Sequence, residues 1–570
     1  MFLSLGRALR SIKSFFFGTK LRTLYTVLGL YCAILYIPYL FQGGLIYDDW
    51  AVAKLSRDCE GLAHSISCFW PGYPDRPLAA LYYSVMSNLF GGWAGGYILV
   101  TVAAWITGVS ILFNIFKQRI GIRFATIFFI FAAVPSVSTT VIFSPAMQGV
   151  GAIAFLMWSL SFYMLNKYVD ARAKSRFIFG YVFMLASLAL YESSLPLFAL
   201  SVIWPLYVLR PGKNKAAFFR DYVKKYLLPV AIVLLILVCY QHFYVQQYYD
   251  YISKVRFSSM NGHLFDFVLR VLFNTGYVFI VSTSMLVLAA FVRLKNLGWE
   301  YILGAVVCVW FVARALALSG LTKTVKKIKF NKSAVLFFAI VLILLGVSVL
   351  HFVAVSPPTS VGYNNRGVVG ISLAVSLSMA LLGQAFIGKK KYITALFVLF
   401  GAGYILSFVI QRNNYIAGAK IQSDIKSQVI PQVNKANQDA MVVLAEVPTY
   451  TNKNFNNETI FSDEVLDWGN FLRVHSNVKS IRGISLSPGR VKRGEVKVVD
   501  GKLKVMTYPE DVPISMVWYF DVKNMHLQKI ADEEELVRII EDAVTHPLHE
   551  YPAPVDARVR NDIRNWLASY

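Results

Sequence analysis

Residues 24–50, LYTVLGLYCAILYIPYLFQGGLIYDDW, contain an apolar run that is followed closely by two adjacent carboxylates. The run from Leu24 to Phe41 has the length and composition of a membrane span. Basic residues precede it, which places the N-terminus in the cytoplasm by the positive-inside rule: Arg7, Arg10, Lys13, Lys20 and Arg22. No small-residue cleavage site follows the run, so we expect an uncleaved anchor. Asp48 and Asp49 should then lie outside, on the periplasmic side in a Gram-negative cell.

Composition sets the class of the protein. The chain has 570 residues, of which 56% are hydrophobic and 15% charged, whereas about 25% are charged in soluble domains. Apolar runs of about 18–25 residues recur along it, which indicates a polytopic membrane protein. Much of the net charge of +24 lies in short connectors between these runs, as in cytoplasmic loops. This distribution argues against a nucleic-acid partner.

Hydropathy and connector charge together predict about eleven spans and place the C-terminus outside with Asp48. Residues 77–90 are apolar but short, and suit an interfacial helix better than a span. Residues 301–319 have basic clusters on both sides, so we expect a re-entrant or in-plane segment there. The expected spans are 24–41, 97–116, 124–143, 149–166, 177–192, 195–209, 226–243, 268–292, 334–352, 368–387 and 392–410.

The composition becomes polar after residue 410. Alternating residues 495–507 surround Asp500-Gly501, which is the signature of a β-hairpin with a tight turn. Residues 441–447 and 515–522 are predicted strands, and 532–544 and 555–567 are predicted helices. We therefore expect a transmembrane domain over residues 1–410, with an external loop at 42–96, and a periplasmic α+β domain over residues 411–570.

Asp48 and Asp49 are the first candidates for catalysis. Carboxylates are costly to hold beside a membrane and are functional candidates there. Repulsion between neighbours tends to raise the pKa of one, and a carboxylate can take the proton of an attacking hydroxyl. One alternative is a solvated loop anchored at the interface by Tyr47 and Trp50. Another is N-capping of the helix that begins near Trp50.

Arg76 and Arg366 are candidate phosphate ligands, because both lie in expected outer loops and arginine can contact phosphate in a bidentate way. The alternative for Arg76 is an ion pair with Asp75. Glu192, beside Tyr191 at the end of an expected span, either faces a cavity or is exposed at the interface.

Cys59 and Cys68 share the external loop, and in an oxidising compartment they can close a small disulfide loop. The other three cysteines lie in apolar runs and suit packing. The sequence contains no Walker-type phosphate loop and no convincing His/Cys metal spacing, so we expect neither an ATP-driven pump nor a metal or other cofactor.

Taken together, these features resemble the GT-C glycosyltransferases, and among them the Gtr-type glucosyltransferases that modify bacterial O-antigen. The resemblance covers roughly residues 20–410 and rests on four features: a first span, an external loop with Asp48-Asp49, Arg76-Pro77 opening a short helix that ends in Leu89-Phe90-Gly91, and many spans before a soluble tail. Residues 411–570 match nothing we can name.

The resemblance implies an inner-membrane enzyme that uses an undecaprenyl-phosphate-linked sugar and a glycan acceptor of O-antigen or lipopolysaccharide. Transfer would be metal-independent and inverting. Asp48 would be the base, with Asp49 a supporting or alternative carboxylate, and Arg76 and Arg366 would hold the donor phosphate. We add the three remaining candidate substrate contacts: Tyr47, Tyr191 and Glu192. Membrane lipid, a carrier-loading glycosyltransferase and a flippase are the implied partners.

Two other functions stay open. A lipid-linked glycan transporter, or flippase, needs ionisable groups near the bilayer midplane, and the expected spans mostly lack acidic residues; Arg314 is the main exception. An O-antigen polymerase also has many spans and external arginines, but the large tail and the loop after the first span argue mildly against it.

Overall fold

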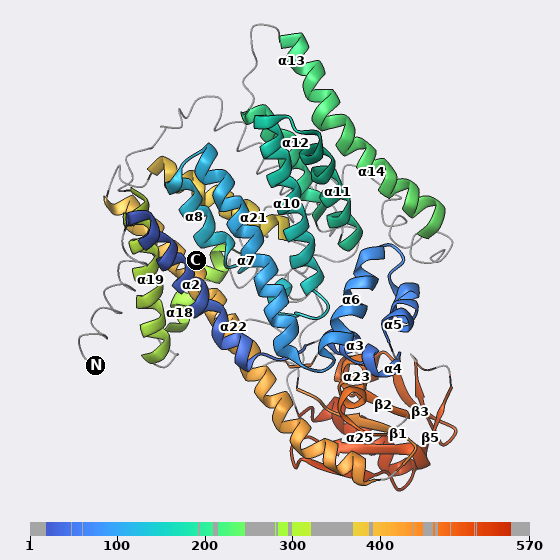
Figure 1. Ribbon diagram of the computed structural model, residues 1–570. Helices are drawn as coiled ribbons and strands as arrows, with labels where there is room; N and C mark the ends of the chain where they lie inside the picture. Colours follow the sequence, from blue (N-terminus) through green and yellow to red (C-terminus); the bar gives the residue numbers. More distant parts are fainter. Residues whose placement is uncertain are drawn as a thin grey trace, which may run out of the picture.

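The computed structural model shows a mostly helical chain with a small β-containing domain near its C-terminus (Figure 1). The residues that it describes are 19–46, 48–59, 61–191, 194–208, 215–245, 280, 283–294, 299–320, 369–386, 391–436, 438–448, 460–461, 465–478, 480–506, 508 and 510–548.

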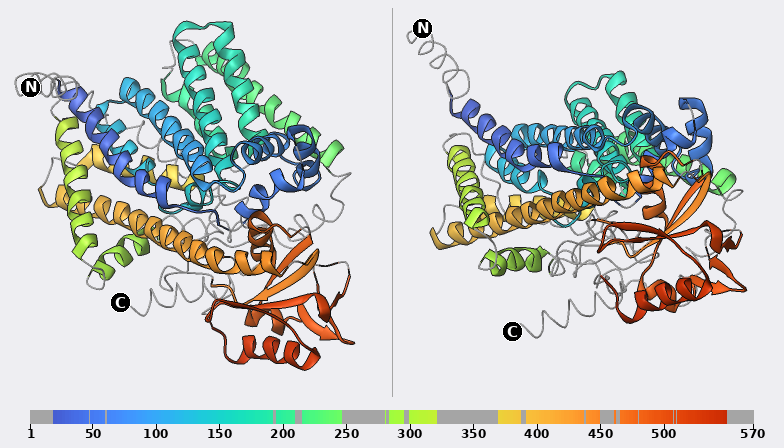
Figure 2. Two further views of the ribbon diagram at one scale, coloured as in Figure 1. Left: turned by 60° about the horizontal axis from the view of Figure 1, so that its bottom comes forward. Right: turned by 90° about the horizontal axis from the view of Figure 1, so that it is seen from below.

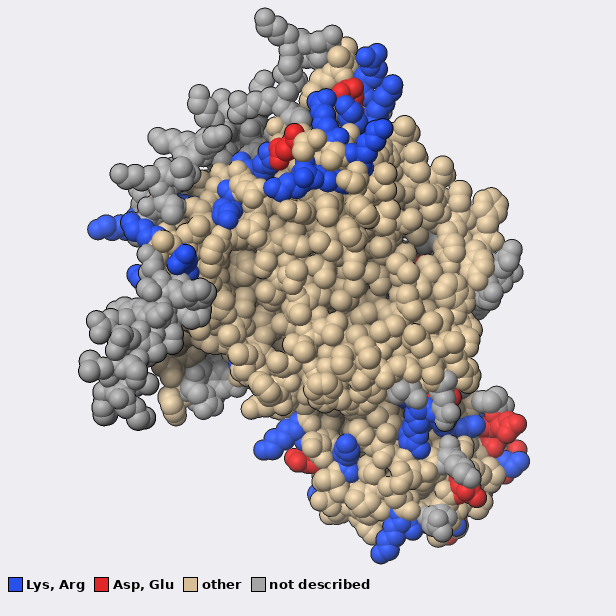
Figure 3. Space-filling model, in the orientation of Figure 1, with Lys and Arg blue, Asp and Glu red and all other residues tan. Residues whose placement is uncertain are grey.

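Six of the described helices are long and apolar enough to cross a membrane. They are α2 (Lys20–Gln42), α7 (Ala94–Arg119), α10 (Gly149–Ala171), the continuous segment Ala216–Val245, α19 (Trp299–Gly320) and α22 (Lys391–Lys435). The segment Ala216–Val245 covers all but the first residue of α13 (Lys215–Tyr222) and all of α14 (Leu228–Tyr240). On the face drawn in Figure 3, charged side chains gather at the two ends and a wide uncharged belt lies between them. A belt of this kind is what a bilayer core requires, so the protein is membrane-embedded.

Shorter helices complete the apolar part: α8 (Ile122–Ala132), α11 (Lys174–Leu190), α12 (Leu195–Val208), α18 (Thr283–Leu294) and α21 (Val369–Phe386). The expected span 334–352 and most of 268–292 lie outside the described residues.

The expected span 124–143 is not a continuous helix. Helix α8 ends at Ala132, and a buried irregular segment with one short helix, α9 (Thr140–Phe143), follows as far as α10. Pro135 cannot donate a helical hydrogen bond, and the Ser136 hydroxyl donates instead to the Tyr404 carbonyl on α22, at 2.9 Å. The side chain of Gln411 joins α22 to the same segment, because its Nε2 donates to the Ser136 carbonyl at 3.2 Å. Irregular backbone is tolerated at membrane depth only when protein surrounds it in this way.

For residues 301–319 the structure contradicts the re-entrant alternative and does not test the in-plane one. A re-entrant segment needs a turn within the membrane, but α19 is one uninterrupted helix of 22 residues. It packs against α2 and α22, and Figure 2 shows it beside both helices from two further directions. The basic clusters that flank it therefore do not mark a turn back.

Helix α2 contains Pro38, whose missing N–H leaves the carbonyl four residues earlier without its helical partner. That carbonyl belongs to Ile34. The Arg412 guanidinium of α22 donates to the Ile34 carbonyl at 2.8 Å and to the Leu35 carbonyl at 3.0 Å. Arg412 is only 8% exposed, so this cation holds two helices together at the point where proline interrupts one of them.

Replacing Arg412 with methionine should lower the free energy of unfolding by about 1–3 kcal/mol, because a buried carbonyl loses its donor. Thermal unfolding of the purified protein in detergent measures the change, with the exposed Arg22→Met as control. The double variant Pro38→Ala, Arg412→Met supplies the cross-check, since alanine restores the N–H for Ile34. Equal losses in the single and double variants would contradict the role assigned to Arg412.

The C-terminal domain contains a four-stranded sheet in the order β2-β1-β6-β7. Strands β1 (Ala440–Ala445), β2 (Ser480–Ser485) and β6 (Val517–Asp521) run parallel, and β7 (His526–Lys529) is antiparallel at one edge. Helix α23 (Val465–His475) connects β1 to β2 as the crossover that parallel strands need. This parallel unit was not part of the sequence-based prediction, which gave only strands and helices.

A second sheet contains β3 (Val496–Val499), β4 (Lys502–Val505) and β5 (Val512–Pro513). The predicted hairpin is confirmed, because β3 and β4 pair antiparallel. Asp500 and Gly501 form the turn between them, with φ values of 51° and 70°. The predicted helix at 532–544 is also confirmed as α25 (Glu533–Thr545), with the Asp532 side chain accepting from the Glu535 amide. The short helix α24 (Pro488–Lys492) completes this part, and residues 555–567 lie outside the described residues.

Helix α22 joins the two parts of the protein without a break (Figures 1 and 2). The expected domain boundary at 410/411 falls inside it. The change in composition there marks where the helix becomes polar, and the helix itself continues to Lys435.

Candidate functional site

The described part of the loop that was predicted to be external contains four α-helices, α3 (Asp49–Ala53), α4 (Leu55–Asp58), α5 (Leu62–Phe69) and α6 (Pro77–Phe90). Helix α6 has the bounds predicted for the short apolar helix. Cys59 and Cys68 form a disulfide, as predicted from the sequence. This cross-link fixes the end of α4 against α5.

Asp49 is fully buried and surrounded by hydrogen-bond donors. Its Oδ1 accepts from the Ser144 hydroxyl at 2.8 Å and from the amides of Ala146 and Met147 at 3.1 and 2.7 Å. Its Oδ2 accepts from the Ile46 amide at 3.1 Å. The carboxylate therefore ties the start of α3 to the turn that precedes α10, about a hundred residues later in the chain.

These contacts leave Asp49 little capacity to take a substrate proton. An ionised carboxylate has about four acceptor positions, and four donors already face it. Burial raises the pKa of Asp49 to about 7, although the hydrogen bonds from Met147, Ile46 and Ser144 lower it; the charge of Asp48 adds to the rise. A pKa near neutrality suits a general base, but access comes first, and Asp49 has none.

The raised pKa of Asp49 predicts a pH-dependent stability. The folded protein holds this proton up to about pH 7, while the unfolded chain releases it near the ordinary value of 3.8. The contribution of Asp49 is thus fully present below about pH 4 and is lost as pH rises through about 7. Melting temperatures of wild type and Asp49→Asn between pH 4 and 8 measure it. We expect the wild type to lose more stability across this window, and parallel curves would contradict the assignment.

Asp48 has a different environment. It occupies the N-cap position of α3, but its side chain makes no capping hydrogen bond, so the structure does not support the capping alternative. Its side chain is partly exposed, in contrast to that of Asp49. Of the two neighbouring carboxylates, Asp48 is therefore the one that a substrate can approach.

Arg76 and Tyr191 lie together. Arg76 precedes α6, and its guanidinium lies over the Tyr191 ring, 4.7 Å from the centroid. The expected ion pair with Asp75 is also present, with Nε 3.7 Å from Oδ2 and both side chains 17% exposed. A cation stacked on an aromatic face has its orientation fixed, so Tyr191 fixes the plane of the Arg76 guanidinium. A guanidinium in a fixed plane suits contact with an anion such as a carboxylate or a phosphate.

The turn before α10 contacts both Asp49 and Tyr191. Met147 donates its amide to Asp49 and accepts the Tyr83 hydroxyl at its carbonyl, at 3.1 Å. The next residue, Gln148, accepts the Tyr191 hydroxyl at 3.4 Å. The sequence-based prediction treated this stretch only as a short outer connector. The signal it missed is Ser-Pro at positions 144–145 and Gln-Gly at positions 148–149, which break the sequence between two apolar runs.

From the list of candidate residues, Asp49 and Tyr191 thus contact neighbouring residues of one turn, and Arg76 stacks on Tyr191. Three other candidates, Tyr47, Glu192 and Arg366, lie outside the described residues.

Comparisons with protein families, curated proteins and solved structures find no match.

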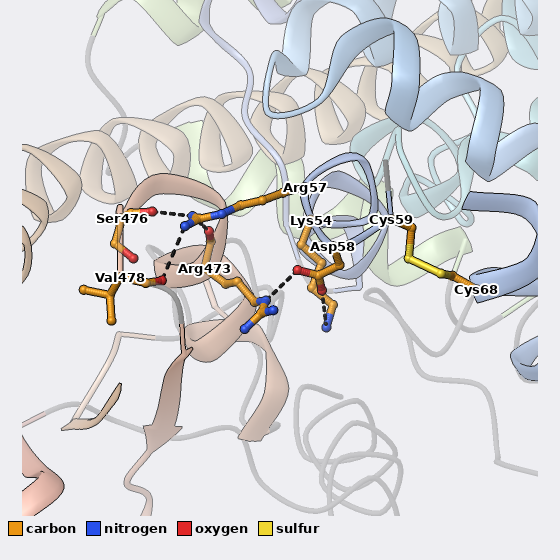
Figure 4. A network of polar contacts seen from close by, with 8 residues as sticks. All are labelled: Lys54, Arg57, Asp58, Cys59, Cys68, Arg473, Ser476 and Val478. Atoms are coloured by element: carbon orange, nitrogen blue, oxygen red, sulfur yellow. Dashed lines mark hydrogen bonds and ion pairs between the residues drawn. A yellow bond between two sulfur atoms is a disulfide. The ribbon is translucent and has the colours of Figure 1, made fainter. Parts of the chain in front are cut away.

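The C-terminal domain docks against the helices that carry the two aspartates. The Arg57 guanidinium of α4 donates to the carbonyls of Arg473, Ser476 and Val478 at the end of α23 (Figure 4). Helix C-termini carry carbonyls without partners and partial negative charge, so a guanidinium suits this position. Asp58 accepts from Arg473 at 2.6 Å. These reciprocal contacts fasten α4 to α23.

An aromatic contact extends the same interface to α3. The Trp50 ring lies edge-on to Phe471 and His475, with centroids 5.1 and 5.4 Å apart. Burial, with the nearby charge of Lys426, lowers the pKa of His475 to about 4, so the imidazole is neutral at physiological pH. The residue next to Asp49 therefore packs directly on the C-terminal domain, which forms part of the site's surroundings.

Replacing Arg57 with alanine should loosen this docking. Charge-assisted hydrogen bonds are worth about 1.5–3 kcal/mol each when buried, and partial exposure reduces the sum to about 1–2 kcal/mol here. Limited proteolysis of the purified protein should then cut the C-terminal domain faster. Arg493→Ala is the matched control, since its guanidinium is 58% exposed and pairs with Glu495 within the same domain. Equal cleavage rates for both variants would rule out a docking role.

Proposed function

We propose that this chain is a membrane-embedded glycosyltransferase of the bacterial inner membrane. It would move a glucosyl or similar hexosyl group from a polyprenyl-phosphate donor to a hydroxyl of O-antigen or lipopolysaccharide glycan on the periplasmic side. The observation that supports this most is the division between the two aspartates. One is buried with its acceptors occupied, and the other is partly exposed at the start of α3.

The proposed roles follow from this division. Asp48 takes the proton of the acceptor hydroxyl as the oxygen attacks the anomeric carbon. The bond from that carbon to the phosphate oxygen breaks, and the electron pair leaves with the polyprenyl phosphate. Asp49 is a positioning residue, since it fixes the backbone on which Asp48 stands through its contacts with the turn at 144–147.

Arg76 stabilises the phosphate that leaves. Its Nε lies 3.7 Å from Asp75 Oδ2, which is longer than the 2.7–2.9 Å or so of a strong charge-assisted hydrogen bond, and we expect a phosphate oxygen to compete with Asp75 for this guanidinium. Tyr191 supports the guanidinium from one face. Arg366 remains the second proposed phosphate ligand on sequence grounds.

The proposal is tested by mass spectrometry of the lipopolysaccharide glycan from cells with the gene and from a deletion strain. We expect a hexose increment only when the gene is present, and its return on complementation. An unchanged glycan mass profile between the two strains would overturn the proposed transfer. A shift in glycan chain length without a hexose increment would favour a polymerase instead, and accumulation of unmodified lipid-linked sugar on the cytoplasmic side would favour a transporter.

A further inference from the structure

A cavity lies beside α13, a helix at the end of the molecule opposite the C-terminal domain and far from α3 (Figure 1). It has a volume of about 350 Å³ and lies between the end of α10 and α13 (Lys215–Tyr222). Four aromatic rings line it, those of Tyr168, Phe218, Tyr222 and Tyr226, and its charged groups are Arg172, Asp221 and Lys225. None of these residues takes part in the site described above.

One wall of this cavity is an unusual helical turn. Residues Val223–Leu227 form a π-helical turn between α13 and α14 (Leu228–Tyr240). Such turns are rare and occur frequently at functional sites. The Tyr181 hydroxyl of α11 donates to the Lys225 carbonyl at 2.8 Å, and the Tyr222 hydroxyl donates to the Val202 carbonyl at 2.9 Å. The wall is therefore held by a side chain of α11 and by a backbone carbonyl of α12.

The cationic group best placed for a ligand is Arg172. It ends α10 in the left-handed conformation, with φ of 46°, and its side chain is exposed at the cavity. Among the described residues, no hydrogen bond or ion pair of its guanidinium is found. Lys225 pairs with Asp221 at 2.7 Å, which neutralises one cation and leaves the cavity with an excess of one positive charge.

The surroundings favour a ligand with an apolar tail. On α14, Leu228, Ile232 and Leu235 are 51%, 47% and 60% exposed, and on α11 Phe179 and Val182 are 51% and 53% exposed. These two helices pack against each other and continue from the cavity into the uncharged belt. A chain that leaves the cavity therefore meets apolar surface.

We propose that this cavity binds the phosphate-bearing headgroup of an anionic lipid, in the leaflet on the side opposite the C-terminal domain. The Arg172 guanidinium contacts the phosphate oxygens, and the four aromatic rings enclose the headgroup. The acyl chains lie along α11 and α14. Basic pockets between membrane helices bind lipid headgroups in this manner. The inference is independent of the proposed glycosyl transfer and of the residues assigned to it.

Native mass spectrometry of the full-length protein, titrated in detergent with phosphatidylglycerol or phosphatidylcholine, tests the proposal. We expect retained phosphatidylglycerol adducts in the wild type and about a tenfold loss of apparent affinity in Arg172→Gln. Lys174→Gln is the charge-matched control, because Lys174 is exposed and does not line the cavity, and it should bind like wild type. Arg172→Gly removes the same guanidinium while suiting the left-handed backbone, so loss of binding in this variant cannot be ascribed to misfolding.

Three outcomes would overturn the proposal. Unchanged adducts in both Arg172 variants would remove the assigned contact. Equal retention of phosphatidylcholine would show that the lipid's net charge is not recognised. Displacement of the lipid by millimolar inorganic phosphate or glycerol phosphate, with these anions retained in its place, would assign the cavity to a soluble phosphate compound.

Discussion

Cells that carry Asp48→Asn should lose the hexose increment on their glycan while they accumulate the protein at wild-type levels. Removal of a general base costs about 10²–10⁴-fold in rate, and asparagine keeps the size and the N-cap position of the side chain. Because the Asp48 side chain is partly exposed and makes no capping hydrogen bond, we expect the melting temperature to change little. This separates loss of chemistry from loss of fold.

The experiment combines glycan mass spectrometry with quantitation of the membrane protein. Asp424→Asn is the matched control, since Asp424 is exposed on α22 and lies outside the proposed site. An undiminished hexose increment from Asp48→Asn would remove Asp48 from the role of base. A loss of the increment in both variants would point to a general effect of removing an acidic charge.

Asp49→Ala should have the largest effect on stability. It leaves four buried donors without their acceptor: the amides of Ile46, Ala146 and Met147 and the Ser144 hydroxyl. Each unsatisfied donor costs about 1–3 kcal/mol, and partial relaxation of the turn reduces the sum to about 3–5 kcal/mol. We expect a strongly reduced yield and melting temperature.

Asp49→Asn removes fewer contacts than Asp49→Ala. It keeps one oxygen for the three donors at Oδ1 and places an amide against the Ile46 N–H. A loss of about 1–3 kcal/mol is expected, smaller than for alanine. Thermal unfolding of the purified variants at one pH gives both values. A stable but inactive Asp49→Ala would contradict the structural role and assign Asp49 to the chemistry.

Features with local signals were predictable from the sequence. The bounds of α6 follow from Pro77 at its start and Gly91 at its end. The β3–β4 hairpin follows from Asp500-Gly501, and α25 from Asp532 at its N-cap. The Cys59–Cys68 bridge followed from two cysteines in one external loop. In each case the deciding residues lie within a few positions of one another.

Features that depend on distant contacts were not predictable. Residues 124–143 are apolar enough to be a span, so the break after Ala132 has no local signal. The irregular segment that follows is stabilised by Gln411, which lies about 270 residues later. Likewise, the sequence offered Asp48 and Asp49 as equivalent neighbours. They are distinguished by burial and by donors from Ser144, Ala146 and Met147, which the fold brings to Asp49 from about a hundred residues later in the chain.

Helix α22 has a mechanical consequence. At 1.5 Å per residue, its 45 residues extend for about 68 Å, more than twice the roughly 30 Å of a bilayer core. The helix is continuous where its apolar part ends and its polar part begins. When the apolar half tilts, the polar half that leads to the C-terminal domain therefore moves with it, in the opposite direction. A tilt of about 10° displaces the far end by roughly 10 Å relative to the near end, which is more than the Arg57 and Asp58 contacts can span. Bilayers of different thickness change helix tilt. We therefore expect bilayer thickness to strengthen or weaken the contacts of Arg57 and Asp58 with the C-terminal domain.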